Sequence, residues 1–418
     1  MRRIRGLLIG TLMIVLVGVM APPAQAWEPK PGGFFNVARA GAKQYILQRQ
    51  IVAAINYAPR GSWIKMSVFS FDRKPPAEAL IRAYKRGVHV QVLLNNHQVT
   101  PAQRMLHRAL GRNRNKNSFA YECTNGCRSK GENNHDKFFL FTRTGTATNV
   151  VMTGSTNLTD NGAQNQFNDL WVKNDAPVLY AGFKRLFEDM RKDRVDPTPY
   201  WRQNIGSQYR IYATPLPRFG PKRDPIMTML NDVRCKGATG GTGANGRTRV
   251  RVVMHAWNGT RGVYLAKKIR ALYAAGCDAR VMYGYAGADV RQTFATRTKR
   301  GYLPVHTTGF DTNGDGFIDL YTHQKELLIS GNYAGDSSSQ VVVTGSSNWN
   351  DEGMKGDEEI FWIKRSGAYA RYISNFRFMW TKKSIQVKYI PYRLAFGRGW
   401  GLTIEPSPKP GGPAWEEG

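Results

Sequence analysis

The chain has 418 residues, 41% of them hydrophobic, and its 60 Lys and Arg residues exceed its 30 Asp and Glu residues to give a formal net charge of +30. This length predicts about two to three domains, and the apolar fraction is enough to bury a sizeable core. So large an excess of positive charge argues against an ordinary solvated surface and indicates a polyanionic partner: nucleic acid, anionic lipid headgroups or acidic cell-wall polymers.

The first 26 residues have the pattern of a secretory signal peptide. Three arginines within the first five residues precede an apolar stretch at 6–20, and a small-x-small cleavage site ends at Ala26. The apolar stretch is shorter than the roughly 20 residues that a membrane-spanning helix needs. We therefore expect a secreted, extracellular protein whose mature chain starts at Trp27, with no other membrane segment.

Four cysteines, an even number in a chain expected to be exported, predict two disulfides. Cys123 and Cys127 flank Thr-Asn-Gly, a turn that brings them within bonding distance, and elimination then pairs Cys235 with Cys277. A zinc site is the competing interpretation. It is disfavoured because neither a second Cys-x-x-Cys nor a pair of histidines accompanies these cysteines.

Apolar periodicity predicts alternating helices and strands through the first half of the chain. Helices are expected at 37–57, 77–86, 101–110 and 177–192, and strands at 64–71, 88–94, 135–141, 149–153 and 167–172. A polar, basic loop at 111–134 leads to His135. A segment at 196–221 with five prolines and two glycines marks a boundary.

The second half repeats this order. Strands are expected at 249–256, 279–283, 323–329, 340–344 and 358–363, and helices at 263–275 and 368–381. The shift is 188 residues (323 − 135), about one domain length. Strands that alternate with helices predict an α/β fold, in which two α/β/α domains pack as a pseudo-symmetric dimer that shares one active site.

The predicted domain organisation follows from this repeat and from the composition at its ends. It comprises a signal peptide at 1–26, a first domain at 27–195, a linker at 196–222, a second domain at 223–385 and a Pro/Gly-rich C-terminal tail at 386–418. The tail is expected to be disordered from about residue 401 onward.

The repeat is centred on two His-x-Lys motifs, each followed by an apolar run, a Gly-Ser-x-Asn turn and an acid. The residues are His135, Lys137, Ser155, Asn157 and Asp169 in the first copy, and His323, Lys325, Ser346, Asn348 and Glu359 in the second. Residues i and i+2 of a strand point to the same side, so each histidine projects together with its lysine. An imidazole offers nucleophilic or acid–base chemistry, and an ammonium group holds an anion beside it.

The other motif residues complete such a site. The Ser and Asn side chains are expected to donate hydrogen bonds to the oxygens of the anion, and Asp169 and Glu359 are each expected to fix the tautomer of a histidine. Two copies would converge on one phosphate with no metal. The alternative is a pair of core histidines beside solvated lysines, which the duplication of the whole pattern disfavours.

The paired His-x-Lys and Gly-Ser-x-Asn motifs resemble those of the phospholipase D superfamily, over about residues 64–381. The resemblance implies a ping-pong phosphodiesterase that forms a phosphohistidine and requires no cofactor. By likeness, His135 is the nucleophile, and His323 protonates the leaving oxygen and then activates water or an acceptor alcohol. Lys137, Lys325, Asn157 and Asn348 would bind the phosphoryl oxygens. We expect a monomer with no obligate protein partner.

The chain departs from the family pattern at two positions. The family commonly has an aspartate five residues after the lysine, where this chain has Thr142 and Ser330. The tyrosyl-DNA phosphodiesterase branch also lacks that aspartate, so its loss need not abolish chemistry. A catalytically degenerate, polyanion-binding member is the alternative.

The substrate has two interpretations. A secreted chain with both copies fused resembles secreted phospholipases D, and we predict cleavage of the headgroup phosphodiester of phospholipids. The charge, with a basic run at 112–116 beside the site loop, favours instead a nuclease that tracks the phosphates of DNA or RNA. The same charge would hold the enzyme peripherally at an anionic membrane, at ~1 kcal/mol per basic residue near the surface.

A segment before His323 copies the start of a calcium loop. Positions 1, 3, 5 and 9 of that loop are Asp311, Asn313, Asp315 and Asp319. Position 12 is Thr322 rather than the bidentate Glu, and an Asp/Asn/Gly-rich hairpin turn explains the sequence as well. A bound calcium ion would be structural and would brace the strand that carries His323. His255, near the end of another strand, is expected to be packed or hydrogen-bonded rather than catalytic.

Overall fold

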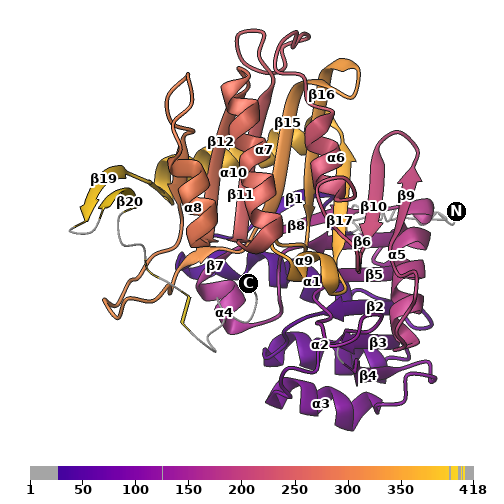
Figure 1. Cartoon of the computed structure of the whole chain (residues 1–418). Coiled ribbons are helices and arrows are strands. Elements are labelled where there is room, and N and C mark those ends of the chain that lie inside the picture. Colours follow the sequence, from indigo (N-terminus) through magenta and orange to yellow (C-terminus); the bar gives the residue numbers. More distant parts are fainter. Residues whose placement is uncertain (1–26, 125, 395–396, 403–405, 407, 410–418) are drawn as a thin grey trace, which may run out of the picture.

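A computed structural model describes residues 27–124, 126–394, 397–402, 406 and 408–409, and Figure 1 shows its two α/β halves. The expected signal peptide at 1–26 lies outside these residues, as does most of the chain beyond 402. Within the described part, no helix is both long and apolar enough to cross a membrane.

The first half is a seven-stranded sheet in the order β1-β8-β6-β5-β2-β3-β4. Its strands are β1 (Gly32–Phe35), β2 (Trp63–Val68), β3 (His89–Leu94), β4 (Phe119–Glu122), β5 (Lys137–Thr144), β6 (Ala147–Gly154) and β8 (Asp169–Lys173). Its helices are α1 (Ile46–Asn56), α2 (Lys74–Lys85), α3 (Pro101–Leu110), α4 (Asp160–Gln164) and α5 (Pro177–Arg191), with a 3₁₀ turn at Gly41–Tyr45. The helix α3 starts at a capping box, in which Thr100 and Gln103 satisfy each other's backbone N–H groups.

The second half is a nine-stranded sheet in the order β18-β13-β12-β11-β15-β16-β17-β10-β9. Its strands are β9 (Trp201–Ile205), β10 (Tyr209–Ala213), β11 (Arg249–Trp257), β12 (Asp278–Ala286), β13 (Val305–Thr307), β15 (Lys325–Tyr333), β16 (Asp336–Gly345), β17 (Glu359–Lys364) and β18 (Ile385–Gln386). Its helices are α6 (Pro225–Asn231), α7 (Gly259–Ala274), α8 (Ala288–Ala295), α9 (Glu352–Lys355) and α10 (Ser366–Lys382). The predicted α/β fold with two similar halves is confirmed.

The halves share one hydrophobic core. Phe183 of α5 lies between Phe138 of the first sheet and Phe361 of the second, with ring centroids 5.5 and 5.6 Å away. The helices α5 and α10 each contact strands of both sheets. A short strand of each half also pairs across the junction, β7 (Gln166–Phe167) with β14 (Tyr321–Thr322). The two motif-bearing segments are therefore held in one rigid frame.

Two segments differ from the predicted organisation. The expected linker contains the hairpin β9–β10, which pairs with β17 and extends the second sheet. Its prolines lie outside the strands, and residues between them alternate as a strand requires, with Tyr209, Ile211 and Ala213 buried. The expected tail begins with another hairpin, β19 (Tyr389–Leu394) and β20 (Gly397–Leu402), which projects beside α8 (Figure 1).

Both predicted disulfides are confirmed. Cys123 is bonded to Cys127 and Cys235 to Cys277. The first closes a tight turn in the loop that leads to His135. The same loop carries Arg128, which is 1% exposed and whose Nε lies 2.7 Å from Asp357 Oδ1 in the second half.

Replacing Arg128 by Met leaves the buried Asp357 carboxylate without its cation. We expect the free energy of unfolding to fall by about 3–5 kcal/mol, because breaking a buried ion pair strands an uncompensated charge. Urea unfolding measures this. Lys364→Met, which removes the half-exposed pair with Asp336, is the matched control and should cost under about 1 kcal/mol. A similarly small effect at Arg128 would contradict the expectation.

Candidate active site

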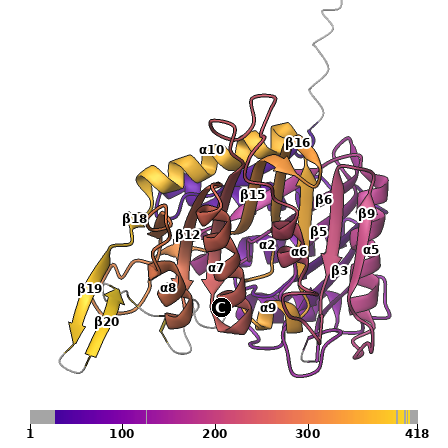
Figure 2. The ribbon, with the colours of Figure 1, turned by 45° about the horizontal axis from the view of Figure 1, so that its top comes forward.

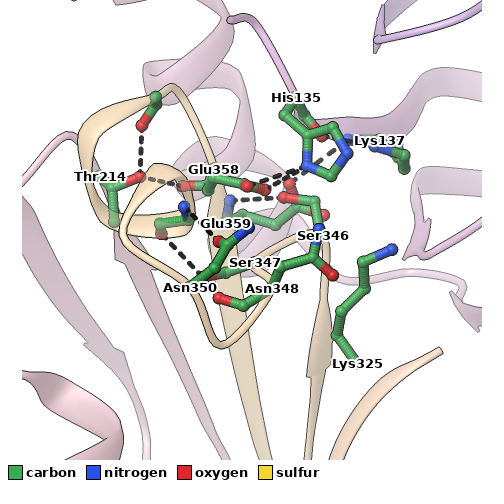
Figure 3. A network of polar contacts seen from close by, with 12 residues as sticks. His135, Lys137, Thr214, Lys325, Ser346, Ser347, Asn348, Asn350, Glu358 and Glu359 are labelled. Atoms are coloured by element: carbon green, nitrogen blue, oxygen red, sulfur yellow. Dashed lines mark hydrogen bonds and ion pairs between the residues drawn. The ribbon is translucent and has the colours of Figure 1, made fainter. Parts of the chain in front are cut away.

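Both His-x-Lys motifs lie at the junction of the two sheets. The two histidines stand two residues before β5 and β15, and each pairs with the opposite half. His135 N donates to Asp357 O at 2.9 Å, and His323 N donates to Phe167 O at 2.8 Å. In Figure 3, Lys325 extends toward the space beside His135 and Lys137. The structure therefore brings the two motifs to one site, as expected from the sequence.

His135 is oriented by a carboxyl group of the other half. Its Nδ1 lies 2.9 Å from both Oε1 and Oε2 of Glu358, and its ring meets the Phe69 ring edge-on at 4.9 Å. An ionised carboxylate only accepts hydrogen bonds, so Nδ1 carries the proton and the lone pair resides on Nε2. Burial raises the pKa of Glu358 to about 7. When Glu358 is ionised, His135 therefore presents the lone pair of Nε2 on the side away from Glu358.

His323 is oriented by neutral groups of the first half. Its Nδ1 donates to Ser155 O at 2.9 Å and to Asn168 Oδ1 at 2.8 Å, and its side chain is fully buried. Burial, together with the positive charges of Lys325 and Lys137, lowers the pKa of His323 well below its ordinary value. A histidine of this kind gives up a proton readily and accepts one when an anion is bound beside it.

The predicted orienting residues, Asp169 and Glu359, are wrong by one position each. Asp169 Oδ2 accepts from Thr344 Oγ1 at 2.5 Å and from Tyr372 at 2.8 Å, and Glu359 Oε1 accepts from Thr153 Oγ1 at 2.9 Å. These contacts tie the halves together behind the site. Successive side chains of a strand point to opposite faces, so the preceding residues, Asn168 and Glu358, face the histidines instead. That alternation was the signal by which the sequence could have indicated them.

The predicted serine donor of the first motif is also corrected. Ser155 Oγ donates to Asn168 Oδ1 at 2.9 Å, and in the second half Ser346 Oγ accepts the Glu359 N–H at 3.1 Å. A hydroxyl has one proton, which Ser155 uses at Asn168. Ser155 therefore supports an orienting residue rather than a bound phosphate.

The lysines and asparagines are held in matching positions in the two halves. Lys137 Nζ donates to His135 O at 2.8 Å, and Lys325 Nζ donates to His323 O at 2.7 Å. Both lysines are at most 3% exposed. Asn157 and Asn348 each accept a backbone N–H through Oδ1, at 3.2 and 3.3 Å, which fixes the orientation of each amide. Two ammonium groups in a buried site attract an anion strongly because little water screens them.

Comparisons with known proteins agree with this geometry. Residues 51–191 match the model of a family described as "Cardiolipin synthase, PLD-like domain". The fold resembles phosphatidylserine synthase of Haemophilus influenzae Rd KW20 (10% identity, TM-score 0.56, 85% of this chain and 87% of that one). It also resembles polyphosphate kinase of Porphyromonas gingivalis (11% identity, TM-score 0.55, 85% of this chain and 48% of that one). Residues 51–191 therefore contain a PLD-like domain by this family model, and the two structural likenesses, each at 11% identity or below, show the fold alone.

Other matches are partial. Nuc of Salmonella typhimurium, a phospholipase D family member, aligns at 21% identity with 38% of this chain and 94% of its own, at a TM-score of 0.30. This chain spans about half the length of the polyphosphate kinase. A search of curated protein sequences gives no match.

The positions at which the phospholipase D superfamily commonly has aspartates lie away from the two His-x-Lys motifs. Thr142 is five residues along β5 from Lys137, which is about 17 Å at the rise of an antiparallel strand. Thr142 Oγ1 accepts the Trp63 N–H at 2.8 Å, and Ser330 Oγ accepts the Gly243 N–H at 3.0 Å. Both residues bind local backbone, so their identity leaves the two motifs intact.

The basic run at 112–116 lies along β4, the edge strand of the first sheet, and leads into the loop before His135, as predicted. Lys116 O accepts from Gln91 Nε2 at 3.2 Å, and Ser118 Oγ accepts from Val90 N at 3.1 Å. These contacts are at the start of β3, whereas Arg112 Nη2 lies 2.8 Å from Glu122 Oε2 at the end of β4, which runs parallel to β3. The cations of the run therefore reach both ends of this edge strand, and Arg112 is paired with a carboxylate.

The predicted calcium loop is an exposed turn in which side-chain oxygens bind backbone. Asp311 Oδ1 accepts from Asn313 N and Gly314 N, and Oδ2 accepts from Gly316 N at 2.8 Å. Asp319 Oδ2 accepts from Thr312 N. In the part of the chain that the structure describes, no group of three or more His, Cys, Asp or Glu residues is arranged to hold a metal ion.

His255 is a third imidazole beside the site. Val68 pairs with Lys137 and Met254 with Lys325, so the next residues, Phe69 and His255, are equivalent in the two halves. The His255 ring is 4.7 Å from that of His323, and its Nδ1 donates to Thr322 O at 3.1 Å. The expectation of a packed, hydrogen-bonded histidine is confirmed, with the contact made to His323 itself.

We expect the rate of phosphodiester cleavage to rise with pH through about 7, as the buried Glu358 ionises and accepts the Nδ1 proton of His135. Glu358→Gln should remove that rise and lower kcat by about 10²- to 10⁴-fold. Glu359→Gln is the matched control, because its carboxyl contacts Thr153 rather than a histidine, and it should keep the pH-dependent rise. Steady-state rates from pH 5 to 9 decide between the two variants.

His255→Phe should fold, because Phe69 packs on His135 in the same way. Loss of the Nδ1 donor should lower stability by about 1–3 kcal/mol. Turnover should fall about 10-fold, since the carbonyl next to His323 loses an anchor. Thermal unfolding and kcat, measured on the same preparation, check both effects. An unchanged kcat with reduced stability would show that His255 supports the fold alone.

Proposed function

We propose that this protein is a phosphodiesterase that forms a phosphohistidine at His135. The observation that supports this proposal is that the two histidines are oriented by different groups. His135 Nδ1 contacts the carboxyl group of Glu358, and His323 Nδ1 contacts the amide of Asn168. When Nε2 of His135 bonds to phosphorus, the imidazole becomes positively charged, and the Glu358 carboxylate stabilises that charge. The amide behind His323 gives no such stabilisation, which suits a residue that must exchange protons.

The reaction then has two steps. In the first, His135 Nε2 attacks phosphorus, the bond from phosphorus to the leaving oxygen breaks, and that oxygen takes the proton from His323 Nε2. In the second, His323 accepts a proton from water, the water oxygen bonds to phosphorus, and the bond to His135 breaks. Negative charge on the substrate offsets the charges of Lys137 and Lys325, so His323 is protonated more readily once substrate is bound.

We propose the headgroup phosphodiester of phospholipids as the substrate. The catalytic side chains support this, because His323 is fully buried and His135 is 6% exposed. A phosphate on a flexible headgroup can enter such a site more easily than one in a stiff duplex. The net charge of +30 favours the second candidate, single-stranded nucleic acid. Two disulfides support the proposal that the protein acts outside the cytosol.

The test is incubation of the protein with mixed phosphatidylcholine, phosphatidylglycerol and phosphatidylserine vesicles, and separately with single- and double-stranded DNA, without added metal. We expect release of lipid headgroup that is abolished in His135→Ala. The control His89→Ala should retain it, because His89 is the first residue of β3, at the end of that strand away from the site. DNA cleavage with the same dependence on His135 would make the protein a nuclease. Intact mass of a His323→Ala variant after mixing with phosphatidyl-p-nitrophenol, whose leaving oxygen needs no proton, should show a phosphatidyl adduct, mapped by peptide analysis to His135.

A further inference from the structure

One face of α10 and β18 combines exposed cations with exposed apolar side chains. We call it the α10 basic face; it comprises Arg371, Arg377, Phe378, Lys382, Ile385 and Lys388, all of them exposed. From residue 365 to residue 404 the sequence has eight Lys and Arg and no Asp or Glu. The positive potential of this face is therefore not offset by acids of its own segment.

The cations of this face lack carboxylate partners among the described residues. Other basic groups of the second half do have such partners, as Lys364 pairs with Asp336 and Arg251 with Asp278. Between the cations, Phe378 is 38% exposed and Ile385 is 57% exposed. Large apolar side chains set among unpaired Lys and Arg are typical of helices that lie in the headgroup region of a membrane.

The α10 basic face reaches the edge of the sheet at which the active site lies. Ile385 of β18 pairs with Thr307 of β13. The next residue, Thr308, accepts the Thr322 N–H through Oγ1 at 3.0 Å, and His323 follows directly. Figure 2 shows α10 running along one side of the second sheet to β18, from which the β19–β20 hairpin projects.

We propose that the α10 basic face docks the protein on an anionic phospholipid bilayer, with Phe378 and Ile385 in the headgroup region and the cations against lipid phosphates. A bilayer fits better than a polynucleotide, because an aliphatic side chain such as Ile385 gains by leaving water but offers no stacking surface to a base. That docking presents headgroups to the buried site rests on the proposed function. Binding of the α10 basic face to a bilayer does not depend on that function.

The experiment measures binding in the His135→Ala background, so that turnover plays no part. Co-sedimentation with phosphatidylglycerol/phosphatidylcholine vesicles at physiological salt is compared with pure phosphatidylcholine. The variant Phe378→Ser/Lys382→Ala/Lys388→Ala should bind the anionic vesicles at least about 30-fold more weakly, because the loss of two cations alone accounts for that factor.

The matched control is Arg82→Ala/Tyr84→Ser/Lys85→Ala on α2. It removes the same charge and one exposed ring, since Tyr84 is 41% exposed, but it lies at the opposite edge, next to the start of β3. We expect its binding to change less than about threefold. Equal losses in the two variants, or no loss in the α10 variant, would overturn the proposal, because binding would then come from net charge or from another face.

Competition by single-stranded DNA tests whether the α10 basic face binds a polynucleotide instead of a bilayer. If DNA binds more tightly than vesicles and the α10 variant loses that binding, the face is a polynucleotide surface and the lipid proposal is overturned. Headgroup release is scored separately with the active protein. Vesicle binding that depends on the α10 basic face, without headgroup release, would refute the proposed function and leave the docking surface standing.

Discussion

The crossed hydrogen bonds, His135 to Glu358 and His323 to Asn168, are the contacts on which the site depends. Each joins residues far apart in the sequence, by 223 and 155 positions. Neither half could orient its own histidine, because the residue that does so belongs to the other sheet. Each histidine therefore needs the other half beside it. Duplication within one chain provides this, because both sheets are always present together and share a hydrophobic core at their junction.

The two halves are similar in backbone and different in charge. Glu358 and Asn168 occupy equivalent positions, as do His255 and Phe69, so the pseudo-symmetry is broken around the histidines. Burial raises the pKa of Glu358 and lowers that of His323, so the two imidazoles have different electrostatic environments at one phosphate. Electrostatic interactions are strong here because the surrounding side chains exclude water. That difference supports the proposed asymmetric reaction, with one nucleophile and one proton donor.

The choice of polyanionic partner depends more on where the positive charges lie than on the net charge. The basic run at 112–116 lies along the edge strand β4, and its Arg112 is paired with Glu122, whereas the cations of the α10 basic face have no carboxylate partner among the described residues and approach the edge that holds His323. A formal charge of +30 attracts any polyanion over a distance of about a Debye length. A preference for a lipid surface over other polyanions requires apolar side chains among the cations, close to the edge that holds the site.

The sequence by itself determined the α/β class, the internal repeat and both disulfide pairs, and it predicted that the His and Lys residues of the two motifs lie together. These depend on local periodicity, on spacing and on residue chemistry, all of which can be read along one chain. The tertiary structure decided which residues orient the histidines, what Ser155 contacts, and that a hairpin replaces the expected linker. The physical reason is that adjacent strand residues such as Glu358 and Glu359 look alike in sequence but face opposite sides. Which of them meets a histidine depends on how two sheets pack across hundreds of residues.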